Sequence, residues 1–73
     1  MENREKIVGD NIRRMRERHG LTQDELADRL GIARAHLYRL ENGIVSMRVR
    51  TLVRIAEMLE VHPSKLFVEK KKK

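Results

Sequence analysis

A very short connection between two helix-forming segments constrains the fold more than any other feature of the sequence. Residues 22–30 carry Leu and Ala at helical spacing and stop at Gly31, and the next helical pattern, residues 34–42, begins three positions later. Helices joined by so few residues have to cross steeply and pack against each other directly. Ala27 and Gly31 allow this close crossing, because alanine is small and glycine readily takes the positive φ that ends a helix.

Helical spacing of apolar residues continues along the rest of the chain, and no stretch alternates as a half-buried strand would. Thr22 and Glu25 predict a capping box at the start of the second helix, and Ser46 is the expected cap of the fourth. Gly9 indicates either close packing in the first helix or a frayed start. We therefore predict an all-α, compact five-helix bundle, with helices over residues 4–19, 22–30, 34–42 and 48–59 and a last short one from Pro63.

The length of 73 residues predicts one domain, residues 1–69, followed by a disordered tail of lysines, residues 70–73. A core this small is marginal, so oligomerisation is expected. The absence of cysteine excludes disulfides and thiolate metal sites and favours a reducing compartment. No apolar run suggests a signal peptide or a membrane span, and we expect a cytoplasmic protein.

The formal net charge of +6 is weak support for any partner, because Lys70–Lys73 contribute four of these charges. The distribution of arginine is more informative. Residues 29–56 contain one acid, Glu41, and six arginines: Arg29, Arg34, Arg39, Arg48, Arg50 and Arg54. Guanidinium groups bond phosphate and guanine in pairs of hydrogen bonds, so this window suits nucleic acid. A solvated charged face is the simpler alternative.

The third predicted helix has two different faces when its residues are stepped at 100° each. Leu37 and Leu40 share an inward sector with Ala33 and Ile44. The opposite sector holds Ala35, Tyr38, Arg39 and Asn42, with Arg34 at the flank of the first turn. A DNA major groove about 12 Å wide admits such a helix, and there arginine pairs with guanine while alanine contacts the thymine methyl.

Three runs in the order "GLTQDELA", "LGIARAHLYRLENG" and "TLVRIAEMLEV" resemble the phage-repressor-like helix-turn-helix domains, the Xre or Cro/cI type, over residues 12–67. The resemblance implies a bundle of four or five helices that binds operator DNA, usually as a two-fold dimer. It also implies that the second helix lies across the major groove and that the third is inserted into it. Small stand-alone members, such as restriction-modification controller proteins, dimerise through their last two helices.

Carried over by position, the resemblance implies base contacts from Arg34, Ala35 and Arg39. It implies phosphate or groove-wall contacts from the N-terminus of the second helix, from the third helix and from the residues after it. His36 lies beside the outward face and is added to this group. The expected set is Thr22, Gln23, His36, Tyr38, Asn42, Ser46 and Arg48. Arg16 and Glu41 match a structural ion pair, and the expected dimer surface is Val49, Val53, Phe67 and Val68, although Val53 and Phe67 fit a core equally well. Two positions depart from the pattern: Ala33 replaces the usual N-cap Ser or Thr, and Met47 stands where Pro is frequent.

These observations favour a sequence-specific regulator of transcription that binds double-stranded DNA as a homodimer on a palindromic operator. We expect no cofactor, small-molecule ligand, membrane or metal, since His19, His36 and His62 follow no ligand spacing. Catalysis is disfavoured because no nucleophile, acid and base cluster in the pattern. The main alternative is an antitoxin-like or other protein-interaction module of the same fold with secondary DNA binding. RNA binding is less favoured, because one Tyr and one Phe are few for stacking on bases.

Overall fold

The computed structural model describes residues 3–69 and contains helices joined by short turns over that range, with no strand. The elements are α1 (Arg4–Arg18), α2 (Gln23–Leu30), α3 (Arg34–Glu41), α4 (Val49–Met58) and a 3-10 helix, η1 (Pro63–Phe67). The predicted all-α fold is confirmed for these residues, and each predicted α-helix boundary lies within one residue of the observed one. No helix of this part of the chain is both long and apolar enough to cross a membrane. The predicted lysine tail, residues 70–73, lies outside the described range.

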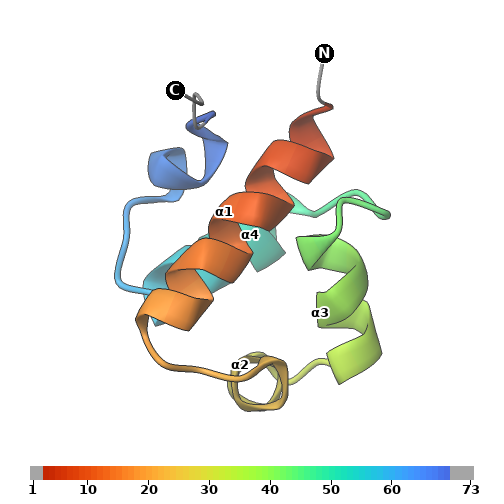
Figure 1. Ribbon diagram of the computed structural model, residues 1–73, viewed down its shortest axis with the longest axis vertical. Coiled ribbons are helices and arrows are strands. Elements are labelled where there is room, and N and C mark those ends of the chain that lie inside the picture. The colour runs from red at the N-terminus through yellow and green to blue at the C-terminus, as the bar shows by residue number, and fades with distance from the viewer. Residues whose placement is uncertain (1–2, 70–73) are drawn as a thin grey trace.

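Helix α1 is the central element of the fold. It packs against η1 and α3, while α2 contacts both α3 and α4 (Figure 1). Every element supplies apolar side chains to one core, whose buried members are Val8, Ile12, Leu26, Ala27, Leu30, Leu37, Leu40, Leu52, Ile55, Ala56, Leu59 and Leu66. Each large aliphatic side chain in this set contributes about 1.5 to 3 kcal/mol by leaving water. One continuous core therefore fixes the orientation of α2 and α3.

The corner between α2 and α3 forms as the sequence predicts. Thr22 Oγ1 accepts a hydrogen bond from the Glu25 backbone N–H at 3.1 Å, and Glu25 Oε1 accepts one from the Thr22 backbone N–H at 2.8 Å. This confirms the capping box at the start of α2. Gly31 ends α2 with φ of 72°, a left-handed conformation that glycine adopts without strain. Ala33 precedes α3 and provides no side-chain cap.

Gly9 marks a close approach between the backbones of α1 and α3. A Cβ atom added to Gly9 would lie 2.5 Å from the backbone oxygens of both Leu40 and Glu41. Such a distance is far below van der Waals contact, so only glycine allows the two backbones to meet there. Of the two interpretations of Gly9, close packing is therefore correct.

Two expectations about the second half of the chain were wrong in detail. The last helix is a five-residue 3-10 helix rather than an α-helix. The α4 helix begins after Arg48, which makes no side-chain cap hydrogen bond, and Ser46 instead donates to Glu5 Oε2 at 3.4 Å. Ser46 lies too early to cap α4, because the N-cap position falls two residues later, at Arg48, while Val45 and Met47 pack against the core.

Ala33 and Ile44 do not share the inward sector of α3, since both are exposed. The helix ends at Glu41, and Gly43 with φ of 68° turns the chain, so helical periodicity no longer applies at Ile44. Ala33 is the N-cap residue of α3 and lies before the first helical residue, so helical periodicity does not apply to it either.

The C-terminal η1 is held to α1 by a buried polar residue that periodicity does not reveal. Asn11 Nδ2 donates to the backbone oxygens of Leu66 and Val68 at 2.8 and 2.9 Å. Asn11 Oδ1 in turn accepts a hydrogen bond from Arg14. Both polar atoms of the buried Asn11 amide are thus hydrogen-bonded, and these bonds fix the position of the chain at the end of η1.

Candidate nucleic-acid interface

Helix α3 lies at one edge of the molecule and presents one face to solvent (Figure 1). Leu37, Leu40 and Glu41 are buried, whereas the remaining residues of the helix are exposed: Arg34, Ala35, His36, Tyr38 and Arg39. Neither arginine is folded under neighbouring protein. The face holds guanidinium groups, a methyl group and a phenol hydroxyl, the groups that read base edges and contact phosphate.

A buried ion pair connects α3 to α1. Arg16 Nε donates to Glu41 Oε2 at 2.6 Å, and Arg16 Nη2 donates to Glu41 Oε1 at 3.1 Å. Arg16 Nη1 also donates to the Leu21 backbone oxygen at 2.8 Å. The Arg16 and Glu41 side chains are only 9% and 1% exposed. Two charges so far from water are tolerated because each is paired and hydrogen-bonded.

Gln23 extends this network to the surface. Its Nε2 donates to Glu41 Oε1 at 3.0 Å, so the first residue of α2 is joined to the last residue of α3. A glutamine amide has two N–H groups, and only one is used by this bond. The second N–H and the backbone N–H groups of Gln23 and Asp24 remain suited to an anion. The phosphate contact expected of Gln23 thus stays a prediction. The hydrogen bond to Glu41 would hold the Gln23 side chain in position for this contact.

Three of the expected phosphate-binding residues surround one polar hollow between α3 and the start of α4. The hollow has a volume of about 360 Å³ and is lined by His36, Leu40, Ser46, Met47, Arg48 and Thr51. The sequence did not single out Thr51, although its place one turn after Arg48 on α4 is a signal that could have found it. Asn42 lies apart from this group, since its Nδ2 donates back to the Tyr38 backbone oxygen at 2.8 Å.

One ion pair on this side of the molecule was not expected from the sequence. Arg34 Nε lies 3.5 Å from Asp24 Oδ1, and both side chains are largely exposed, at 64% and 78%. The pair joins the first turns of α2 and α3. An acidic residue therefore accompanies the first of the two arginines assigned to base contacts.

The pKa of Glu25 is shifted by its place in the capping box. The backbone N–H of Thr22, and next its hydroxyl, hold the pKa of Glu25 below its ordinary value, and Arg29 adds to this effect. The cause is the capping box, which favours the charged carboxylate. Glu25 is therefore a structural acid of α2.

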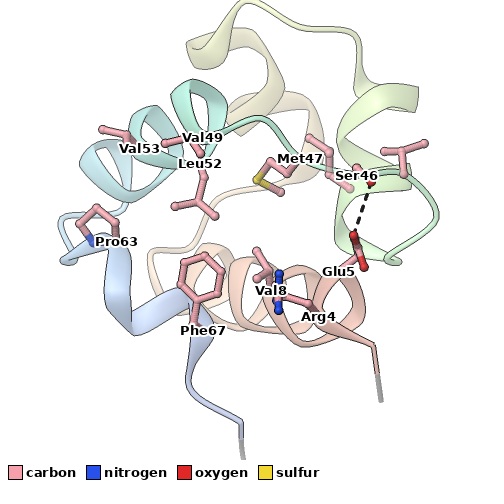
Figure 2. A pocket seen from close by; sticks show the side chains of 12 residues that line it. Arg4, Glu5, Val8, Ser46, Met47, Val49, Leu52, Val53, Pro63 and Phe67 are labelled. Carbon is pink, nitrogen blue, oxygen red and sulfur yellow. Dashed lines mark hydrogen bonds between the residues drawn. The ribbon is translucent and has the colours of Figure 1, made fainter. Parts of the chain in front are cut away.

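A large apolar hollow lies away from α3's exposed face, between α1, the segment before α4, α4 itself and η1 (Figure 2). Its volume is about 470 Å³. Figure 2 shows Met47 and Leu52 pointing into it, with Val49, Val53 and Phe67 at its border. Val49 is 77% exposed and Phe67 48%, so Phe67 is not a core residue. Val53 is partly buried.

The expected dimer residues do not all lie together. Val49, Val53 and Phe67 line the apolar hollow, whereas Val68 lines a smaller one with Asn11 and Arg14. Asn11 places Val68 there by holding its backbone oxygen. For metal ions, the described residues contain no cluster of three or more His, Cys, Asp or Glu able to bind one.

Comparison with known proteins gives a consistent result. A family model described as Helix-turn-helix (HTH_3) matches residues 12–66. The chain is 41% identical over 56 residues to a protein of Sinorhizobium fredii named uncharacterized HTH-type transcriptional regulator y4dJ, covering 77% of this chain and 73% of that one. It is 33% identical over 57 residues to an uncharacterized HTH-type transcriptional regulator of Archaeoglobus fulgidus, covering 78% and 81%. Among solved structures, the restriction-modification controller protein C.AhdI from Aeromonas hydrophila superposes with a TM-score of 0.80 at 27% identity, covering 85% of this chain and 94% of that one.

Proposed function

Because the chain belongs to the helix-turn-helix family, we propose that it is a transcriptional regulator that binds a palindromic duplex DNA site as a homodimer. Helix α3 enters the major groove, and α2 lies across it with its N-terminus at the phosphate backbone. The names of the two relatives, both HTH-type transcriptional regulators, support the general function. The observation that carries the proposal is the exposed face of α3.

On this proposal, Arg34, Ala35 and Arg39 contact bases. The two arginines are exposed and long enough to pair with guanine O6 and N7, and the Ala35 methyl contacts a thymine methyl. Tyr38 and His36 contact the groove wall and phosphate on either side. Sequence choice then rests on two arginines that the buried side of α3 holds in register.

Phosphate contacts position the helix on the duplex. The N-terminus of α2, with Thr22 and Gln23, contributes on one side of the groove, and the polar hollow contributes on the other through Ser46 and Arg48. These contacts supply most of the affinity, and they release counterions, so binding weakens as salt rises. Asn42 can contribute through its second amide N–H, since the first donates to the Tyr38 backbone oxygen.

The dimer is proposed on the apolar hollow and its border. Val49, Val53 and Phe67 surround a concave apolar surface, and exposed apolar patches of this kind are characteristic of protein interfaces. For both α3 helices to enter successive major grooves, the two-fold axis of the dimer has to set them about 34 Å apart, which is one turn of DNA, and the operator is then a palindrome.

Selection of bound duplexes from a random pool tests the proposal directly. We expect a two-fold symmetric consensus with guanines in each half-site. On that site Arg39→Ala should lose about 1 to 3 kcal/mol of binding free energy and clearly less on random DNA. Gln23→Ala should weaken both equally.

No enrichment from the pool would reject sequence-specific binding and favour the protein-interaction module instead. Equal losses for Arg39→Ala on both kinds of DNA would show that Arg39 only neutralises phosphate. An enriched sequence without symmetry would reject the palindromic dimer while leaving base recognition intact.

A further inference from the structure

We propose that Asp24 is a specificity-determining residue, which holds the Nε atom of Arg34 so that the two terminal nitrogens face a guanine, and which keeps phosphate away from this arginine. The proposal rests on the proposed function, because it concerns the same surface. By its charge alone, an acidic residue on this surface would only repel DNA. Here it contributes to the choice of sequence.

The position of the pair is the first observation. Asp24 is in the first turn of α2, and Arg34 begins α3 after the tight corner at Gly31. Their contact, 3.5 Å from Asp24 Oδ1 to Arg34 Nε, is made on the outer surface, where both side chains remain exposed. The pair therefore lies at the two helix N-termini that face DNA in the proposed complex.

The atom that Asp24 contacts determines which hydrogen bonds are left. A guanidinium group has five N–H groups in one plane, one on Nε and two on each terminal nitrogen. Because the Asp24 carboxylate contacts Nε, at 3.5 Å, a side-on pair of bonds through Nε would have to displace this ion pair, whereas an end-on pair through Nη1 and Nη2 would leave it in place. These two nitrogens have the spacing to donate to O6 and N7 of one guanine. The contact thus selects one way of using Arg34.

The charge of Asp24 acts in the same direction. A free arginine on this face binds any phosphate in reach, which adds affinity for every sequence. The Asp24 carboxylate only accepts hydrogen bonds and repels a phosphate that approaches Arg34. Asp24 therefore lowers affinity for random DNA more than affinity for a site with guanine at the matching position.

Asp28 offers a matched control. It lies one turn after Asp24 on α2, is exposed and carries the same charge. Asp24→Asn and Asp28→Asn raise the net charge equally, but only the first removes the contact with Arg34. Both positions are on the surface, and thermal unfolding followed by circular dichroism verifies that each variant is folded.

The experiment measures dissociation constants for the selected site and for a scrambled duplex of equal length and composition, at two salt concentrations. The proteins are wild type, Asp24→Asn, Asp28→Asn, Arg34→Ala and the double variant Asp24→Asn with Arg34→Ala. We expect Asp24→Asn to lower the ratio of scrambled to specific dissociation constants about two- to fivefold, the range that an exposed ion pair provides. Asp28→Asn should strengthen binding to both duplexes without changing this ratio, and Asp24→Asn should not change it once Arg34 is absent.

Equal effects of Asp24→Asn and Asp28→Asn on the ratio would overturn the proposal, because only net charge would then matter. A loss of specificity that persists without Arg34 would also overturn it and would show that Asp24 contacts a base itself, since a carboxylate accepts from cytosine N4. If wild type prefers no sequence, the proposed function fails and the role of Asp24 with it. If wild type selects a site and Asp24→Asn retains the full preference for it, only the role of Asp24 fails.

Discussion

At the scale of single residues, Glu41 is the side chain on which the candidate interface most depends. It accepts hydrogen bonds from Arg16 of α1 and from Gln23 of α2 while it ends α3. These bonds fix the distance between the start of α2 and the exposed face of α3. A buried acid in the core thus determines how two surface elements lie relative to a duplex.

Glu41→Ala is expected to destabilise the protein by about 3 to 5 kcal/mol, because it leaves the Arg16 charge buried without a partner. Replacing both residues by apolar ones, as in Arg16→Met with Glu41→Leu, should cost less than the single change, since no buried charge remains. Urea unfolding measures both free energies. A double variant as unstable as Glu41→Ala would show that the network contributes through its hydrogen bonds rather than through charge compensation.

The capping box predicts a pH effect at Glu25. Its pKa is lowered in the folded protein, so folding favours the ionised carboxylate. The stabilisation is complete above the pKa of the unfolded chain and is lost as the pH falls through the lower, folded pKa. Wild type should therefore unfold at a higher temperature than Glu25→Gln at pH 7, and the difference should shrink toward about pH 3. A difference that is independent of pH would contradict this origin.

At the level of elements, α1 and the end of α3 are joined by the Arg16–Glu41 ion pair and also by a close backbone contact. Gly9 allows it, and on the other side of the contact a Cβ on Gly43 would lie 2.7 Å from the Lys6 Cα. The last turn of α3 is thereby held against α1 while its first turn projects to the surface. Together with the corner at Gly31, this contact sets the angle at which α3 is presented.

Gly9→Ala tests this contact by the sign of its effect. Helix propensity alone predicts that the change stabilises α1 by about 1 kcal/mol. The added Cβ would lie 2.5 Å from two backbone oxygens of α3, so we expect a net loss of about 1 to 3 kcal/mol, the usual cost of overpacking. Thermal unfolding distinguishes the two results, and a more stable variant would show that α1 and α3 are not so close.

At the scale of the whole molecule, the proposed interface and the apolar hollow lie on different parts of one small core. Leu40, Ser46 and Met47 line both the polar hollow near α3 and the apolar hollow. The segment before α4 therefore separates the surface proposed for DNA from the surface proposed for the second subunit. A change at the subunit surface is expected to alter DNA binding through dimerisation, without touching the α3 face.

Val49→Glu is the variant that tests the dimer. Val49 is highly exposed and begins α4, where an acidic residue suits the helix dipole, so the monomer should remain folded. We expect a shift toward monomer in sedimentation and a weaker, less cooperative binding to the full palindrome. Val68→Glu is the matched control, because Val68 lines a different hollow. If Val68→Glu dissociates the dimer and Val49→Glu does not, the apolar hollow is not the subunit surface.

The helices and the two faces of α3 could be predicted from local patterns in the chain. Helical periodicity, the Thr22–Glu25 capping box and Gly31 act locally, within one or two turns, so they can be recognised without a tertiary structure. The exposed row of arginine, alanine and tyrosine on α3 follows from the same periodicity. The family resemblance added the expectation that Arg16 and Glu41 meet, a contact between residues far apart in the chain.

Which side chains meet across different elements could be seen only in the folded molecule. Three contacts join different segments: the Asp24–Arg34 ion pair, the hydrogen bond from Gln23 to Glu41, and the hydrogen bonds from Asn11 to Leu66 and Val68. Local spacing contains no information about such contacts, because they depend on how α2, α3 and η1 are placed on α1. For the same reason, the predictions that Ile44 faces the core and that Ser46 caps α4 were wrong. Where the helical period stops, the packing of Val45 and Met47 against the core determines the path of the chain.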